Sequence, residues 1–65
     1  MSNTIGNNVF SRRKQMNMTG TELGNKVGVS SSMIYAIESG EKKPGVETLI
    51  ALAKAFKCKV DDLVH

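Results

Sequence analysis

The segment 19–40 constrains the fold most, because it carries the signals for two short helices joined by a tight turn. Thr19 is followed three residues later by Glu22, which is the spacing of a capping box. A helix is therefore expected to begin at Gly20. Gly28 can adopt a positive φ at little steric cost, so it is expected to end this helix.

The second helix of this segment has two different faces. Ser30 is placed to cap its first turn, and Gly40 to end it. At about 100° per residue, the larger apolar side chains point one way, toward a core: Met33, Ile34 and Ile37. The small or hydroxyl-bearing side chains share the opposite face: Ser31, Ser32, Tyr35 and Ala36. Such a helix, held at an angle by a glycine turn, has the geometry of one that enters the major groove of DNA.

The chain resembles the lambda-repressor-like helix-turn-helix family, of the Cro and phage-repressor type. The matching residues are Glu22-Leu23, Gly28-Val29-Ser30, Ile34, Ile37-Glu38, Gly40, Pro44, Leu49, Leu52-Ala53 and Leu63. The resemblance covers nearly the whole chain, from about Ile5 to Val64. The resemblance implies an all-α, compact five-helix domain with the helix-turn-helix at its second and third helices. It also implies a sequence-specific DNA-binding transcriptional regulator, most simply a repressor.

Length and charge agree with this interpretation. With 65 residues there is room for one domain, 1–65, and for a small core. Nine Lys and Arg against six Asp and Glu give a net charge of +3, which suits a polyanionic partner. Residues 1–44 carry six of the basic and three of the acidic side chains, and the remainder is balanced. The positive charge therefore lies on the half that holds the candidate DNA-reading helix.

Other function classes have little support in the sequence. Cys58 is the single cysteine and His65 the single histidine, so a structural zinc site is not expected. There is no Ser, His and Asp set, phosphate-binding loop or apolar run long enough to span a membrane. We expect a cytoplasmic protein of bacterial or phage origin that is not an enzyme and takes no cofactor, metal or small-molecule ligand.

Three further helices are predicted outside the central segment. The first runs over 4–16, with Ser2 or Thr4 as its cap and Asn17 as its left-handed terminator. Its inward side chains are expected to be Ile5, Val9 and Met16. The next runs over 46–56 with Gly45 as N-cap, and its apolar stripe is Val46, Leu49, Ile50, Ala53 and Phe56. A last short helix is expected over 60–64.

Two charged residues are predicted to face inward. Arg13 lies four residues after Val9, and Glu38 four residues after Ile34. Because a buried unpaired charge is strongly unfavourable, an Arg13–Glu38 ion pair is expected between the first and third helices. The family resemblance implies the same structural pair. Phe10 has two alternatives: burial against the C-terminal segment, or an exposed contact for a partner.

The predicted DNA contacts fall into two groups. The base-reading group is Ser31, Ser32, Tyr35 and Ala36, although Tyr35 has the alternative of reaching a phosphate. The phosphate-binding group is Gly20 and Thr21 through their amides, with Lys42, Lys43, Arg12 and Lys26. Gly20 stands where many members of the family carry a glutamine, so here the helix N-terminus is left to act through its amides. Gly24 stands where they usually carry alanine, which permits a closer helix crossing.

One short helix reads few base pairs, so a homodimer on a double-stranded DNA operator is expected. The expected dimer surface is Phe56, Val60, Leu63 and Val64, with closure of the monomer core as the alternative. Two other functions stay open. The chain could be an antitoxin or accessory subunit with autoregulatory DNA binding, in which Phe10 and the apolar C-terminal residues would face a partner protein. It could also be a protein-binding module without DNA contact.

Overall fold

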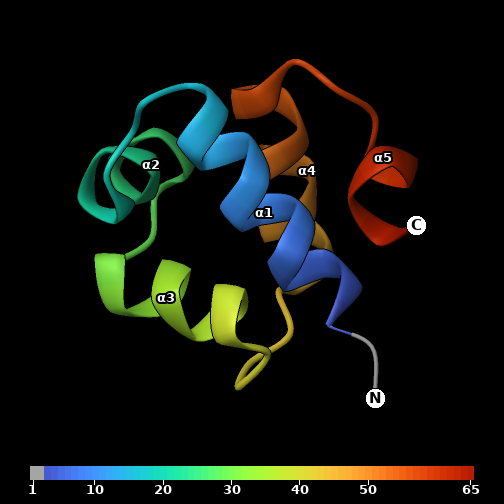
Figure 1. The fold of residues 1–65 in the computed structure, drawn as a ribbon, viewed down its shortest axis with the longest axis horizontal. Helices are drawn as coiled ribbons and strands as arrows, with labels where there is room; N and C mark the ends of the chain where they lie inside the picture. The colour runs from blue at the N-terminus through green and yellow to red at the C-terminus, as the bar shows by residue number, and fades with distance from the viewer. Residues whose placement is uncertain (1–2) are drawn as a thin grey trace.

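The computed structural model describes residues 3–65, which form five α-helices and no strand (Figure 1). They are α1 (Thr4–Gln15), α2 (Gly20–Val27), α3 (Ser31–Ser39), α4 (Val46–Phe56) and α5 (Val60–Val64). The predicted all-α, five-helix fold is confirmed. The first helix ends one residue earlier than predicted, and Asn17 adopts the expected left-handed conformation with φ of 55°.

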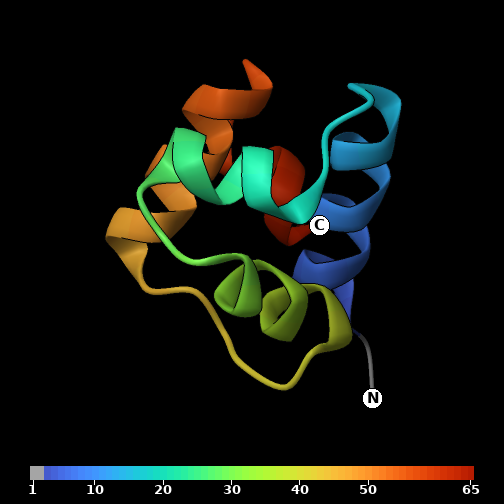
Figure 2. The same ribbon diagram turned by 90° about the vertical axis from the view of Figure 1, so that its left-hand side faces the viewer.

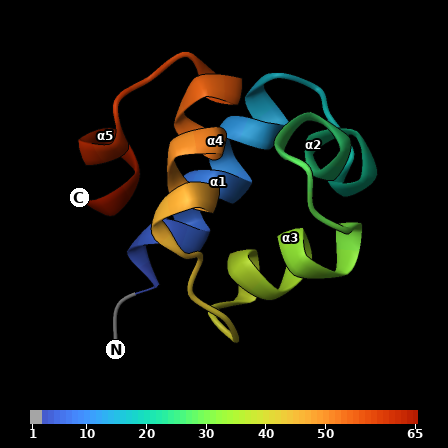
Figure 3. The same cartoon turned by 180° about the vertical axis from the view of Figure 1, so that it is seen from behind.

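The helices are arranged so that α3 lies at one end of the molecule. α1 packs against α3, α4 and α5, while α2 packs against α3 and α4. Figures 1 and 2 show α3 and its connection to α4 together along the lower edge. Seen from behind, α4 lies in front of α1, with α5 at its side (Figure 3). One side of α3 is therefore uncovered by any other described helix.

The core draws side chains from all five helices. Its buried apolar members are Val9, Met18, Leu23, Ile34, Ile37, Leu52, Ala53, Phe56 and Leu63. Each large aliphatic or aromatic side chain stabilises the fold by about 1.5–3 kcal/mol when fully buried. A domain of this size has few such residues, so single polar interactions take a large share in its stability.

Three residues predicted on apolar faces are exposed instead. Met16 is 42% exposed, Val46 73% and Ile50 42%. The better-covered positions of α4 are Leu49, Leu52, Ala53 and Phe56. Ile50 is about 100° from Leu49 around the axis, Val46 begins the helix, and Met16 follows the end of α1. The prediction therefore assigned these three residues wrongly to the buried faces of α1 and α4.

The expected dimer surface at the C-terminus is also wrong in part. Phe56 is 7% exposed and Leu63 is fully buried, because both belong to the monomer core. Val60 and Val64 are half-buried. The carbonyl of Leu63 accepts a 2.9 Å hydrogen bond from the Asn8 side-chain amide, which ties α5 to α1. The alternative, closure of the monomer core, is confirmed for Phe56 and Leu63.

The start of α1 is joined to the end of α3. Asn3, not Thr4, occupies the N-cap position, and Ser2 lies outside the described residues. The Asn3 side chain makes no capping bond to its own helix. Its Nδ2 instead donates a 2.8 Å hydrogen bond to the carbonyl of Glu38. This contact was not predicted, because a short amide reaching across 35 residues leaves no local sequence pattern.

Candidate nucleic-acid interface

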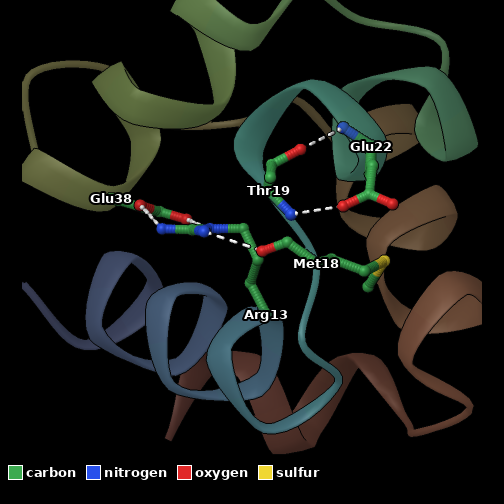
Figure 4. A network of polar contacts seen from close by, with 5 residues as sticks. All are labelled: Arg13, Met18, Thr19, Glu22 and Glu38. Carbon is green, nitrogen blue, oxygen red and sulfur yellow. Dashed lines mark hydrogen bonds and ion pairs between the residues drawn. The ribbon is translucent and has the colours of Figure 1, made fainter.

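The start of α2 is fixed by the predicted capping box. The amide of Glu22 donates to Thr19 Oγ1 at 3.1 Å, and the Thr19 amide donates to Glu22 Oε1 at 2.8 Å (Figure 4). Two of the first-turn amides are thereby satisfied. The amides of Gly20 and Thr21 have no hydrogen-bond partner among residues 3–65. They remain as donors at the positive end of the helix dipole.

The turn between α2 and α3 has the predicted form. Gly28 has a φ of 81°, and its amide donates to the carbonyl of Gly24 at 2.8 Å. The Val29 amide donates to the same carbonyl at 2.9 Å. Ser30 then caps α3, because its hydroxyl accepts from the Met33 amide at 3.2 Å. The angle between the two helices is thus determined by local hydrogen bonds.

Gly24 is required at the helix crossing. A Cβ at this position would lie 2.5 Å from the carbonyl oxygen of Val29, a backbone atom that cannot rotate away. We expect Gly24→Ala to lower the free energy of unfolding by about 1–3 kcal/mol, measured by urea denaturation. Because alanine is a better helix former than glycine by about 1 kcal/mol, the clash must cost more than this gain in helix stability. Asn25→Ala, at an exposed position of the same helix, should be neutral or slightly stabilising.

The predicted ion pair between Arg13 and Glu38 is present. Arg13 Nε donates to Glu38 Oε2 at 2.6 Å and Nη2 to Oε1 at 3.1 Å, and both side chains are only 8% exposed. Arg13 Nη1 also donates to the carbonyl of Met18 at 2.9 Å (Figure 4). The hydrogen bond to Glu38 raises the pKa of Arg13, against the opposing effect of burial. One guanidinium therefore joins α1, α3 and the segment that leads into α2.

The outward face of α3 contains the predicted base-reading residues. Ser32 is exposed, Tyr35 is 50% exposed, and Ser31 and Ala36 are half-buried. Ser39 shares this face and was not predicted, although it follows Ser32 by two helical turns. Its hydroxyl donates to the carbonyl of Ala36 at 3.1 Å, so it is engaged within α3. Apart from Tyr35, the residues available to a ligand are short, and the face carries no charged side chain.

Tyr35 does not point freely away from α3. Its ring covers Gly20, because a Cβ on Gly20 would lie 2.5 Å from Tyr35 Cζ and 2.7 Å from its hydroxyl oxygen. The guanidinium carbon of Arg13 lies 5.8 Å from the centre of the same ring, within cation–π range. Gly20 is consequently buried, whereas Thr21 is exposed. Of the two predicted amide contacts, Thr21 is the more accessible.

The predicted phosphate-binding cations are separated by the fold. Lys42 and Lys43 are exposed, and the Lys42 amide donates to the carbonyl of Ala36 at 3.2 Å, which holds their loop beside α3. Arg12 is half-buried on α1. Lys26 is exposed and shares a shallow hollow with residues of α4 and the position after it, namely Ala51, Lys54, Ala55 and Lys57. The loop lysines therefore lie beside α3, and Lys26 lies at the side of α4.

Phe10 is 46% exposed, and its ring lies beside two cations. Arg13 and Lys14 stand 5.5 and 5.7 Å from its centre.

Among residues 3–65, no three His, Cys, Asp or Glu side chains gather as they would around a metal ion. None of the described helices is long and apolar enough to cross a bilayer.

A capped helix, a glycine turn and a second capped helix with an uncovered outward face define a helix-turn-helix protein. The chain belongs to the helix-turn-helix family, whose pattern matches residues 10–63. Repressor protein C2 of Salmonella phage P22 is 38% identical over 60 residues, which are 92% of this chain and 28% of that protein. The transcriptional repressor RstR of cryptic phage CTXphi of Vibrio cholerae is 30% identical over 91% of this chain and 53% of its own length. This chain thus spans about a quarter and about half of these two repressors.

Other relatives are closer to it in length. An uncharacterized HTH-type transcriptional regulator of Methanocaldococcus jannaschii, MJ0272, is 38% identical over 72% of this chain and 71% of its own. Among solved structures, the P22 c2 repressor in complex with synthetic operator 9T superposes with a TM-score of 0.90 at 38% identity. That match covers 92% of this chain and 91% of the repressor chain. The solution structure of the P22 c2 DNA-binding domain gives a TM-score of 0.89.

Proposed function

We propose that this protein is a sequence-specific DNA-binding transcriptional regulator, most simply a repressor, that places α3 in the major groove of its operator. The observation that carries the proposal is the 0.90 TM-score, at 38% identity, to a repressor solved on operator DNA. The uncovered face of α3 and the lysines beside it supply the matching chemistry. The protein would act as one domain, 1–65, in the cytoplasm and without enzymatic activity.

The proposed contacts divide into two kinds. Ser31, Ser32 and Ala36 would face base edges, with the alanine methyl group against thymine methyls. Lys42, Lys43 and the first-turn amides of α2 would bind phosphates and fix the position of α3. Arg12 is a further phosphate candidate on α1, and Lys26 one that would require the DNA to reach the α4 side. Tyr35 stands at the border between the two kinds.

The function as an antitoxin or accessory subunit has lost one of its supports. That hypothesis placed Phe10 and the apolar C-terminal residues against a partner protein. Phe56 and Leu63 are instead part of the core, whereas Phe10 is 46% exposed. Because a single α3 contacts only a few base pairs, we propose that two copies bind two half-sites about one helical turn apart.

The test is a binding selection from randomised duplexes with the wild-type protein. An enriched sequence with two related half-sites, a stoichiometry of two chains per duplex and weaker binding at higher salt would support the proposal. Absence of duplex binding at low salt would reject it. Enrichment of one unpaired half-site at a stoichiometry of one would reject the homodimer and leave DNA binding in place.

A substitution on the outward face should change what is selected. We expect Ser32→Ala to alter the base preference at one or two positions of each half-site, by about 1–3 kcal/mol between bases. Binding to random duplexes should stay within about twofold, since no phosphate contact is removed. The measurement is a repeated selection with the variant, accompanied by direct titration of random duplex. An identical selected sequence would show that Ser32 does not read a base.

A further inference from the structure

We infer that Tyr35 contacts a DNA phosphate through its hydroxyl rather than a base edge, and that Gly20 is the residue that allows it. The inference rests on the proposed function and refines the role of one residue within it. It also explains why the chain has glycine at the first position of α2. The two residues would act as one unit, which neither position reveals alone.

The position of Tyr35 around α3 is the first observation. Tyr35 lies about 60° from Ser32 and about 60° from Glu38, between the two around the helix axis. Glu38 faces α1, because it is bound to Arg13 there. Tyr35 is therefore nearer than Ser32 to the side of α3 that faces α1 and α2, although Ser31, about 20° from Glu38, lies nearer still.

The second observation is that the ring is held in this direction from two sides. It rests over Gly20, where even a methyl group would stand 2.5 Å from Cζ. The Arg13 guanidinium, itself fixed by Glu38, lies 5.8 Å from the ring centre. With these contacts the side chain keeps 50% of its surface exposed. A ring directed along the groove toward bases would have to leave both.

The third observation concerns the hydroxyl group. Its oxygen would lie 2.7 Å from a Cβ on Gly20, so it stands at the first residue of α2. The amide of Thr21, at the next residue, has no partner among residues 3–65. A phosphate oxygen bound at this helix end would meet a phenolic O–H as well as backbone N–H groups. The hydroxyl thus joins the phosphate-binding donors.

The test compares Tyr35→Phe with the wild-type protein, using a selected duplex and a random duplex as probes. The substitution removes only the hydroxyl and leaves the ring seated on Gly20. We expect roughly tenfold weaker binding to both duplexes, as for a lost hydrogen bond to a charged group. The preferred sequence should be unchanged. The slope of log affinity against log salt should also be unchanged, because a neutral hydroxyl releases no counterion.

Gly20→Ala supplies the second arm, because its methyl group displaces the ring. It should weaken binding to both duplexes to the same extent, and the combined variant should be no weaker than either single one. Ser32→Ala is the control that should change base preference. Thermal unfolding checks that each variant is folded. If Gly20→Ala does not fold, the result for Tyr35→Phe alone tests the inference.

Three outcomes would overturn the inference. A changed base preference in Tyr35→Phe would make Tyr35 a base-reading residue, and unchanged affinity would limit it to packing. In both cases the wild-type protein still binds DNA, so the proposed function stands. Failure of the wild-type protein to bind any duplex would reject the proposed function and this inference together.

Discussion

Glu38→Ala is expected to lower the free energy of unfolding by about 3–5 kcal/mol, the cost of leaving a buried charge without its partner. The Arg13 side chain is 8% exposed, and its guanidinium would lose both hydrogen bonds to the carboxylate. A domain of fewer than about 70 residues rarely has more than 3–5 kcal/mol in total. The variant should therefore be largely unfolded at 25 °C, as measured by far-ultraviolet circular dichroism.

Two further variants separate the charge from the shape. Glu38→Gln keeps an acceptor oxygen and should lose less stability, which urea denaturation can measure. The combination of Arg13→Met and Glu38→Leu removes both charges and should be more stable than Glu38→Ala, although the Met18 carbonyl then loses its donor. A loss below about 1 kcal/mol in Glu38→Ala would contradict this account, because that is the range of an exposed pair.

The pH dependence of this pair has a definite sign. The hydrogen bond to Glu38 raises the pKa of Arg13 above its already high ordinary value. A group whose pKa is raised on folding contributes its full stabilisation below the unfolded pKa and loses it only as the pH rises through the folded one. The contribution of Arg13 is therefore present throughout the neutral range and disappears only in strong alkali.

The parts of the fold that were predicted correctly are those with short-range signals. Capping pairs, glycines with positive φ and i, i+4 spacing involve residues within one or two turns, so Thr19, Glu22, Gly28 and Ser30 indicated α2 and α3 directly. The Arg13–Glu38 pair is long-range. It was nevertheless predictable, because two opposite charges on two apolar faces require each other.

The errors arose where burial depends on what lies opposite a residue. Val46 and Ile50 continue an apolar pattern on α4, yet no neighbouring helix covers them. Phe56 and Leu63 are large apolar residues, which are typical of an interface as well as of a core, and here both belong to the core. The position of Tyr35 over Gly20 was not predictable either. A glycine in the sequence indicates that there is space beside the backbone, but not which side chain fills that space.

Replacing Lys42 and Lys43 together by alanine is expected to weaken binding to all duplexes. Each lysine that neutralises a phosphate adds about 0.9 to the slope of log affinity against log salt, so the pair should lower the slope by about 1.8. Over the tenfold change from 1 M to 0.1 M salt, a slope difference of about 1.8 corresponds to about 60-fold, so the variant should bind about 60-fold more weakly at 0.1 M. The base preference should be retained, because these lysines lie on the loop beside α3 rather than on its outward face.

The matched control for this variant is Lys54→Ala combined with Lys59→Ala. It also removes two positive charges, but from the end of α4 and the connection to α5. These segments lie at the opposite side of the molecule from α3 (Figure 1). If phosphate contacts are local, its salt slope should match that of the wild-type protein. If both double variants lose the same slope, net charge alone governs association and the assignment of Lys42 and Lys43 is wrong. A changed base preference in the loop variant would instead mean that the loop positions α3 in the groove.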